Sequence, residues 1–596
     1  MSFNTISELF KNTVTKYPNR ELYFYKKGNN WSSLNGKTIL YTVTDISNAL
    51  LGKGLQKSDK VGIISTNSPK WAMIDYGVIC SGCATVSIYP TLIPSQISYI
   101  IKDSGLKVLF LENEDQLEKI NQIWTECPSL ELVVMMNDSF DGELDNVVKF
   151  STFLDMGMEY GNKNPNSFSD ASESISPDDL LTLIYTSGTT GTPKGVMLSH
   201  GNLASNIKAT YRAQKFNDHE VFLSFLPLSH VFERMTGHFS AFGIGAKTYY
   251  AESIETLAEN MKDAKPTILI SVPRVYEKIH AKIVSGVERA PAIRRAIFNW
   301  SYKTGRKASL LKYNKNSLPF LLKVKYSIAK KLVFDKVKST FGGDIKNLIS
   351  GGAPLSKELG EFFYALNIVI LEGYGLTETS PIITCNRADA YRFGTVGQPL
   401  DNVEVQIASD GEILCKGPNV MKGYYNKEKE TAESIKNDWF YTGDIGEIDS
   451  DGFLKITDRK KSLIITSGGK NVAPAPLENS ILNSVYVEQC IVLGDKKNFI
   501  SCLIVPNFES LENFLKKENI DMSSNQAIIE HKQVIKLYDK IIEDSMKGFS
   551  RFEIVKKYRL LTDLWTLDKE ELTPSLKVVR KKIQQNYKSI IDEMYN

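Results

Sequence analysis

Short runs of apolar, β-branched residues alternate with amphipathic stretches through most of the chain. The first runs cover residues 61–65, 84–90, 107–113 and 131–138, and the alternation returns at 221–234 and 266–280. This order predicts a largely parallel sheet flanked by helices, because parallel strands need a crossover segment between them. Residues 155–178 are polar and poor in apolar anchors, so we expect a surface excursion there.

The pattern changes twice in the last third of the chain. From Asn402 onward, short strands are joined by Asp-Gly turns at 410–411 and 451–452, which predicts a small β unit. Beyond 458–461 come a helix at 475–484, two apolar strands and helices rich in Lys and Glu, a set that could fold alone. We therefore predict an α/β protein. Its large N-terminal domain (1–458) holds stacked, mainly parallel sheets with flanking helices and the small β unit, followed by a hinge (459–461) and a mobile α+β C-terminal domain (462–596).

Composition narrows the class of protein. The chain has 596 residues, 42% of them hydrophobic and 24% charged, which is typical of a globular protein with at least two domains. Its 72 basic and 69 acidic residues leave a net charge of +3, which gives no global argument for nucleic-acid binding. Seven dispersed cysteines favour a reducing compartment. Cys80 and Cys83 lie among small apolar residues, which favours core thiols over a metal site.

The N-terminal residues lack the basic start and apolar run of a signal peptide, and no apolar run reaches the roughly 18 residues that a membrane span needs. We therefore expect a cytoplasmic protein without a transmembrane helix.

Three short strands lead into turns made of small residues, at 181–195, 345–356 and 367–380. The first turn is built from Thr, Ser and Gly and closed by Lys194; open backbone N–H groups, hydroxyls and a positive charge suit a phosphate. It is not a Walker A loop, because Pro193 stands where that motif has its second Gly and Gly195 replaces its Ser/Thr. Turns of this kind converge at the carboxyl edge of parallel sheets, where ligands bind.

With these segments in hand, the chain resembles the adenylate-forming superfamily, which includes acyl-CoA synthetases, firefly luciferase and nonribosomal adenylation domains. The resemblance spans the chain and rests on seven segments: YTSGTTGTPKG (185–195), LPLSH (226–230), SGGAPLS (350–356), GYGLTETS (373–380), YTGDIG (441–446), DRKK (458–461) and TPSLK (573–577). Within this superfamily, the chain looks most similar to long-chain fatty acid–CoA ligases. Three segments carry this similarity: LPLSHVFER (226–234), residues 271–283 and the C-terminal residues 563–583.

The resemblance implies a reaction in which a carboxylate attacks the α-phosphorus of ATP and pyrophosphate leaves. Positive charge and Mg²⁺ are needed where charge gathers, and positioning does most of the catalytic work. It implies these phosphate-binding residues: Thr186, Ser187, Gly188, Thr189, Thr190, Gly191, Lys194 and Thr377. Glu378 is implied as the magnesium carboxylate. The resemblance also implies the adenosine site. Gly351, Gly352 and Ala353 would lie beside adenine, and Tyr374, with Gly373 and Gly375 in the same turn, would stack on it. Asp444 and Arg459 would bind the ribose.

Further roles follow from the same resemblance. Lys577 resembles the adenylation lysine, carried on the C-terminal domain, and Lys461 occupies the hinge. His230 corresponds to a residue near the acyl carboxylate, and Gly469 and Asn471 lie where relatives admit the pantetheine of coenzyme A. One departure is that many relatives have Gly before the catalytic lysine, where this chain has Leu576.

The implied activity is ATP-dependent formation of a long-chain acyl-adenylate followed by transfer to coenzyme A. A ligase that loads an acyl carrier protein, or a CoA ligase for another acid, would share every motif. A non-catalytic acyl or nucleotide sensor is the alternative from another class, and it would have no use for a mobile, acid-activating Lys577. The sequence assigns neither chain length nor oligomeric state.

Residues 289–338 form a strongly basic segment with one acid, Asp335, and interleaved aromatic residues. This mixture suits the interface of an anionic membrane, and the alternative is a solvated helical face whose aromatics pack inward. We expect peripheral contact at the inner face of a membrane. The basic residues are Arg289, Arg294, Arg295, Lys303, Arg306, Lys307, Lys312, Lys315, Lys323, Lys325, Lys330, Lys331, Lys336 and Lys338.

Overall fold

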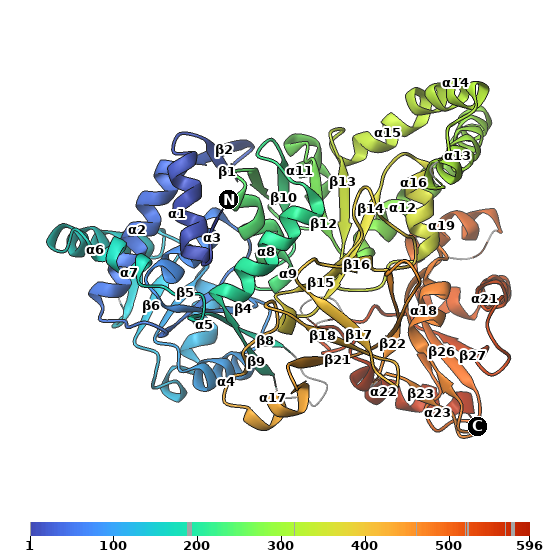
Figure 1. Cartoon of the computed structure of the whole chain (residues 1–596). Coiled ribbons are helices and arrows are strands. Elements are labelled where there is room, and N and C mark those ends of the chain that lie inside the picture. The colour runs from blue at the N-terminus through green and yellow to red at the C-terminus, as the bar shows by residue number, and fades with distance from the viewer. Residues whose placement is uncertain are drawn as a thin grey trace.

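Two large sheets form the body of the protein (Figure 1). The computed structural model describes residues 2–142, 144–186, 193–314, 316–460, 462–518, 520, 524–566, 568–573 and 578–595. The strand orders are β19-β9-β8-β4-β3-β5-β6-β7 and β16-β15-β14-β13-β12-β10-β11-β1-β2. Inner strands pair in parallel, and the antiparallel pairs lie toward the sheet edges. The predicted α/β class with mainly parallel sheets is confirmed.

The strands of the first sheet are β3 (Lys60–Ile64), β4 (Ala84–Ile88), β5 (Val108–Leu111), β6 (Leu132–Met135), β7 (Val147–Lys149), β8 (Leu180–Thr186), β9 (Lys194–Ser199) and β19 (Gly423–Tyr424). Those of the second are β1 (Glu21–Lys27), β2 (Asn30–Asn35), β10 (Val221–Ser224), β11 (Lys247–Tyr250), β12 (Ile268–Ser271), β13 (Asn347–Ser350), β14 (Ile370–Gly375), β15 (Ile382–Cys385) and β16 (Gln398–Pro399).

Helices cover the sheets and also lie between them. Helix α3 (Pro69–Cys80) contacts strands of both sheets and is buried along nearly its whole length, as expected of a helix that is apolar all round. Ser68 caps its N-terminus and Pro69 opens its first turn, where a missing N–H costs nothing. The other helices of the body include α1 (Ile6–Lys16), α2 (Gly36–Gly52), α4 (Pro94–Ser104), α5 (Glu114–Asn121), α8 (His200–Gln214), α11 (Leu257–Ala264), α12 (Pro273–Glu288) and α16 (Lys357–Ala365).

The segment expected to be a surface excursion, 155–178, does lie mostly at the surface, but it is helical rather than an irregular loop. Most of these residues belong to α6 (Phe150–Lys163) and α7 (Ser167–Glu173), and α6 packs closely against α2. A Cβ at Gly157 would lie 1.8 Å from the Asp45 carbonyl oxygen, and one at Gly161 would lie 2.5 Å from the Asn48 amide. Close helix contact through glycine replaces the apolar anchors whose scarcity motivated the prediction.

The small β unit forms as predicted. It contains β17 (Glu404–Ile407), β18 (Glu412–Lys416), β20 (Ile435–Lys436), β21 (Trp439–Ile448) and β22 (Leu454–Arg459), all paired antiparallel. The turn glycines Gly411 and Gly452 have φ of 84° and 82°, a conformation that the missing side chain permits.

The C-terminal region has its own sheet and its own core. Strands β25 (Val487–Leu493), β26 (Ile500–Pro506) and β27 (Val555–Leu560) form the sheet, and the predicted helix is α18 (Pro474–Leu482). The buried clusters of this region draw only on residues from Ile464 onward. Arg274 of α12 bonds to Glu488 across the boundary. The division into domains at 458–461 stays a prediction.

Three expectations about surfaces and thiols have direct outcomes. All seven cysteines are free and buried, so the prediction of core thiols at Cys80 and Cys83 is confirmed. Within the described residues, no helix has both the length and the apolar character to cross a membrane. The basic segment forms α13 (Ala292–Tyr313), α14 (Phe320–Ala329), the π-helix η3 (Lys330–Phe334) and α15 (Asp335–Lys338), and α13 and α14 project from the body at the upper right of Figure 1.

Candidate active site

The phosphate-loop motif is the connection of a β-hairpin. Strands β8 and β9 pair antiparallel, and Thr186 lies opposite Lys194 at the open end of the ladder. The Tyr99 hydroxyl donates to the carbonyl of Pro193, 3.0 Å away, and so fixes the returning strand. The remaining predicted loop residues lie outside the described residues: Ser187, Gly188, Thr189, Thr190 and Gly191.

Tyr424 connects the base of this loop to the predicted magnesium carboxylate. Strand β19 pairs with β9, which places the Tyr424 ring 4.9 Å from the Lys194 ammonium. The Tyr424 hydroxyl donates to Glu378 Oε1 at 2.8 Å, and burial together with Glu378 raises the pKa of that hydroxyl. The backbone N–H of Met421 also bonds to the Glu378 carbonyl, 2.8 Å away. The structure thus gathers Lys194 and Glu378 around one tyrosine.

Sequence reasoning missed Tyr424. Its only signal is an aromatic pair, Tyr424-Tyr425, after a glycine, which by itself indicates nothing beyond packing. Thr377 and Glu378, by contrast, come directly from the quoted motif and lie in the short 3₁₀ helix η5 (Thr377–Thr379) after β14.

A second polar cluster joins β14 to the small β unit. The Tyr374 hydroxyl donates to Asp444 Oδ2 at 2.7 Å, and Arg459 Nε lies 3.3 Å from Asp444 Oδ1. Asp444 and Arg459 are register partners on β21 and β22. Asp444 is only 4% exposed, and burial together with its carboxylate raises the pKa of Tyr374 well above the usual value. Three of the residues predicted to surround adenosine, Tyr374, Asp444 and Arg459, are therefore brought together.

The glycine turn after β13 leaves room for little besides backbone. A Cβ at Gly351 would lie 2.8 Å from the ring of Phe232, and Gly352 has a φ of 78°. In β14, a Cβ at Gly375 would lie 1.7 Å from the Pro381 carbonyl oxygen, so this position also requires glycine. Gly373 and the exposed turn residue Ala353 lie in the same two segments, as predicted.

Glu372 is a buried carboxyl at this edge that sequence reasoning missed. It pairs in register with Ser350, the residue that begins the glycine turn. Burial raises the pKa of Glu372 to about 8. A carboxyl that holds its proton near neutral pH can donate a hydrogen bond as well as accept one.

His230 caps the short helix α9 (Val231–Glu233). Its Nδ1 accepts the Phe232 N–H at 3.1 Å, which leaves Nε2 as the ring nitrogen available to carry a proton. Ser87 of β4 and Asn67 of the loop between β3 and α3 hold this turn. The Ser87 hydroxyl donates to the Ser229 carbonyl at 3.0 Å, and Asn67 Oδ1 accepts the Leu228 N–H at 2.9 Å. Since Phe232 also contacts the Gly351 turn, His230 lies at the junction of the two sheets.

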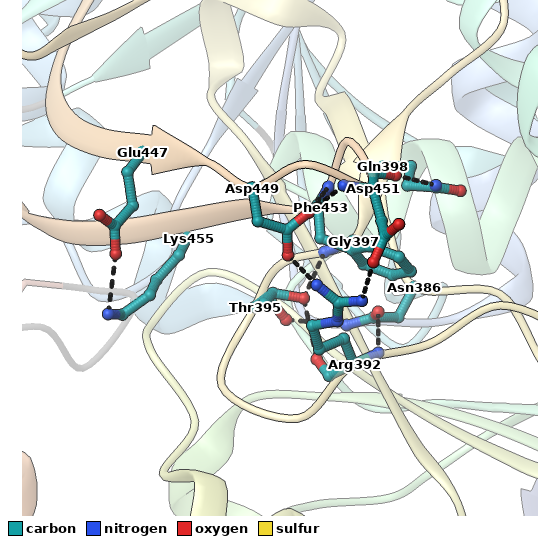
Figure 2. Close-up of polar contacts among 10 residues, drawn as sticks. All are labelled: Asn386, Arg392, Thr395, Gly397, Gln398, Glu447, Asp449, Asp451, Phe453 and Lys455. Carbon is teal, nitrogen blue, oxygen red and sulfur yellow. Dashed lines mark hydrogen bonds and ion pairs between the residues drawn. The ribbon is translucent and has the colours of Figure 1, made fainter. Parts of the chain in front are cut away.

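Arg392 fastens the small β unit to the second sheet (Figure 2). Its guanidinium bonds to Asp449 and, at 2.6 Å, to Asp451, both in the turn between β21 and β22. Its backbone N–H donates to Asn386 Oδ1 at 2.9 Å, directly after β15. This clamp fixes the hairpin that carries Asp444 and Arg459 relative to β14.

The predicted residues of the hinge and C-terminal region are only partly visible. Lys461 and Lys577 lie outside the described residues. Gly469, with a φ of 72°, and Asn471 lie on the exposed hairpin of β23 (Ile464–Ile465) and β24 (Asn471–Val472). No atom of the described residues lies within 4 Å of the position that a Cβ would take at Gly469. Their predicted role toward coenzyme A stays a prediction.

Comparison with known proteins supports the reading of these segments. The chain is 34% identical over 557 residues to "Long-chain-fatty-acid--CoA ligase FadD15" of Mycobacterium bovis, covering 92% of this chain and 90% of the relative. It is 32% identical over 626 residues to "Long-chain-fatty-acid--CoA ligase ACSBG2" of Xenopus laevis, covering 99% and 84%. Among solved structures, the anthranilate CoA ligase AuaEII in complex with anthranoyl-AMP superposes with a TM-score of 0.75 at 18% identity, covering 99% and 98%. This last likeness concerns the fold alone.

Models of two protein families match almost the whole chain. One describes the AMP-binding enzyme and matches residues 10–425, and the other describes the AMP-binding enzyme C-terminal domain and matches residues 461–596. The predicted resemblance to adenylate-forming enzymes, and to long-chain fatty acid–CoA ligases among them, is confirmed. The chain belongs to the AMP-binding enzyme family.

Proposed function

We propose that this protein is a long-chain fatty acid–CoA ligase. It joins a fatty acid to the α-phosphate of ATP with release of pyrophosphate, then transfers the acyl group from the adenylate to the thiol of coenzyme A with release of AMP. The observation that carries the proposal is the pair of carboxylate–tyrosine clusters, Glu378 with Tyr424 and Asp444 with Tyr374, at the edge where both sheets present their turns. The names of the relatives supply the long-chain substrate and the CoA acceptor.

Adenosine would bind between the glycine turn and β14. Gly351, Gly352 and Ala353 present backbone to the flat base, the Tyr374 ring stacks on it, and Asp444 accepts from the ribose hydroxyls. Arg459, whose side chain is 57% exposed, would reach the ribose from β22.

The triphosphate would follow the β8–β9 hairpin, with Thr186 and Lys194 at its base and the loop residues 187–191 around the β- and γ-phosphates. Among the described residues, no three acidic, His or Cys side chains form a metal cluster. This fits Mg²⁺ rather than opposing it, because Mg²⁺ usually takes one or two protein carboxylates and completes its shell with substrate phosphates and water. Glu378 would be that carboxylate, with Thr377 bonding a phosphate beside it. The ion would supply positive charge where the phosphate oxygens gather charge.

The acyl carboxylate would lie beside His230, whose orientation is set by the Phe232 N–H. Lys577 would then enter from the mobile C-terminal domain and stabilise charge between the carboxylate and the α-phosphate. A turn of that domain about Lys461 would withdraw Lys577 and bring Gly469 and Asn471 to the pantetheine path.

ATP–pyrophosphate exchange across carboxylates of graded chain length tests the first step. We expect exchange that depends on a long-chain acid, and acyl-CoA formation only when coenzyme A is added. Exchange without any thioester product would favour an acyl carrier protein as acceptor, which assays with acyl carrier protein would test. No exchange with any acid would overturn the enzyme assignment.

We also propose a cytoplasmic enzyme that contacts the inner face of an anionic membrane through residues 289–338. The basic residues of this segment, with Asp335 as its one acid, support the contact. Long-chain fatty acids partition into bilayers, so an enzyme resting there meets its substrate at high local concentration.

A further inference from the structure

The exposed face of α14 is apolar although it belongs to the most basic part of the chain. Phe320 and Leu321 are 78% and 74% exposed, and Val324, Ile328 and Leu332 are 44%, 46% and 42% exposed. Positions 320, 324 and 328 follow each other at intervals of four, so they share one face of the helix, and 321 is seven residues before 328. Contiguous exposed apolar area of this kind marks an interaction surface.

The opposite face holds α14 to the body, which leaves the apolar face unused by the fold. The Tyr326 hydroxyl donates to Asn367 Oδ1 at 2.7 Å, and Ala329 and Val333 are buried in the core of the second sheet. Helix α13 is anchored separately, since a Cβ at Gly305 would lie 2.0 Å from the Ala365 carbonyl oxygen of α16. Both helices are therefore fixed to the body while their outer surfaces face away from it (Figure 1).

Positive charge surrounds this apolar face. A groove on α14 is lined by Phe320, Lys323, Val324, Ser327, Ile328 and Lys331, so two lysines lie directly beside the apolar side chains. Lys325 of α14 and Lys330, the first residue of η3, are also exposed. An apolar strip with lysines at its margins is the arrangement of helices that lie in the interface of an anionic bilayer, where the strip enters the acyl region and the ammonium groups stay at the phosphates.

We propose that α14 inserts its apolar face, led by Phe320 and Leu321, into the surface of an anionic lipid bilayer. This inference deepens the proposed membrane contact of residues 289–338, which by charge alone would stop at the headgroups. The partner is a membrane rather than an acidic protein because lipid offers both the phosphates for the lysines and a fluid apolar layer for the strip.

Sedimentation of the full-length protein with phosphatidylglycerol/phosphatidylcholine vesicles and with pure phosphatidylcholine vesicles tests the contact. Wild type should bind the anionic vesicles. Reversal of Lys323, Lys325 and Lys331 to Glu should weaken binding by about 100-fold or more, since each lysine near the surface contributes about a factor of five. The matched control reverses Lys532, Lys536 and Lys540, which are exposed on α21 (Lys532–Ser545) of the C-terminal region, and should bind as wild type does.

The apolar face has its own variant. Phe320→Ser with Leu321→Ser should weaken binding by about 10-fold or more and remove the part of it that resists high salt. Both side chains are exposed, so the variant should fold normally. Met158→Ser with Ile254→Ser removes comparably exposed apolar side chains, 51% and 56% exposed, elsewhere on the surface and should have no effect.

Insertion depth can be read directly. Because all seven native cysteines are buried, Leu321→Cys offers one accessible thiol for an environment-sensitive fluorophore. Its emission should shift to the blue on anionic vesicles and be quenched by lipids that carry a quencher in the acyl chain, whereas the same label at Met158→Cys should not respond.

The outcomes separate the ideas. If the lysine reversal abolishes binding but the serine variant binds as wild type does and the label at 321 stays in water, insertion is refuted and headgroup contact remains. If the serine variant changes only the oligomeric mass in solution, a second copy covers the face, and the proposal is overturned. Vesicle binding needs no substrate, so neither result bears on the ligase activity, and failure of ligation leaves the binding result intact.

Discussion

Replacing Glu233 by Gln should remove a pH-dependent cost of folding. Glu233 follows His230 in α9, is 1% exposed, and burial raises the pKa of its carboxyl from 4.5 to about 8. The fold therefore favours the neutral carboxyl, whereas the unfolded chain ionises above pH 4.5. Stability attributable to this group is fully present below pH 4.5 and is lost as the pH rises toward 8.

The magnitude follows from the size of this shift. Each pH unit between the two pKa values changes the free energy of unfolding by ~1.4 kcal/mol, so the group costs wild type ~2.7 kcal/mol more at pH 7 than at pH 5. Glutamine has nearly the same shape and no ionisable proton. The free energy of unfolding of Glu233→Gln, relative to that of wild type, should therefore rise by about this amount between pH 5 and pH 7 and level off above pH 8.

Urea unfolding followed by tryptophan fluorescence at several pH values measures the difference between variant and wild type. An infrared difference spectrum, wild type minus variant, checks the protonation state itself. Glu372 contributes equally to both proteins, so a protonated-carboxyl band in this difference at pH 6 belongs to Glu233 and should disappear near pH 8. Glu404→Gln, at an exposed position of β17, changes the same charge without removing a buried carboxyl and should give no such trend. A constant difference between pH 5 and pH 7, with no band at pH 6, would show that Glu233 is ionised in the fold and refute the reasoning.

Further predictions concern the proposed reaction and the clamp in Figure 2. Lys577→Ala should lower acyl-adenylate formation by about 100-fold or more while thioester formation from supplied acyl-adenylate stays near wild type; equal damage to both steps would contradict its assignment. Lys461→Pro should preserve adenylation but slow transfer to coenzyme A, so acyl-adenylate accumulates; normal turnover would place the hinge elsewhere. Arg392→Met should lower the free energy of unfolding by ~1 kcal/mol and raise the KM for ATP, because the ion pairs of Arg392 with Asp449 and Asp451 position the β21–β22 hairpin. The control Lys455→Met breaks an ion pair within that hairpin and should leave the KM unchanged.

The elements that the sequence predicts well are those in which local pattern and tertiary role coincide. The strand-to-glycine turns could be read because a buried strand and a turn each leave a local signature, and Gly351 and Gly375 prove to be sites where a side chain has no room. The polar segment 155–178 shows the limit of that reading. Its helix α6 is held by glycine contacts with α2, and nothing in the local hydrophobic pattern reports that a neighbouring backbone will approach so closely.

The same limit explains the site residues that were missed. Tyr424 matters because β19 pairs with β9 and because η5 brings Glu378 beside it, two long-range facts that a local pattern does not contain. Glu372 was inside a quoted segment but outside its motif. Its significance depends on its burial and on its place opposite Ser350 in the neighbouring strand, which only the register of β13 and β14 reveals.

The two tyrosine–carboxylate pairs give the site a common physical logic. A carboxylate as buried as Asp444 needs hydrogen-bond donors to offset the loss of water. A buried lysine as partner would form an ion pair, which an incoming cation or hydroxyl would have to displace at considerable cost. A tyrosine hydroxyl donates one hydrogen bond to a single carboxylate oxygen and so orients the carboxylate; at Asp444 this bond adds to the ion pair with the largely exposed Arg459. Tyr374 and Tyr424 thus fix the orientation of Asp444 and Glu378, which suits the proposed acceptance of ribose hydroxyls at one carboxylate and the proposed binding of a metal ion at the other.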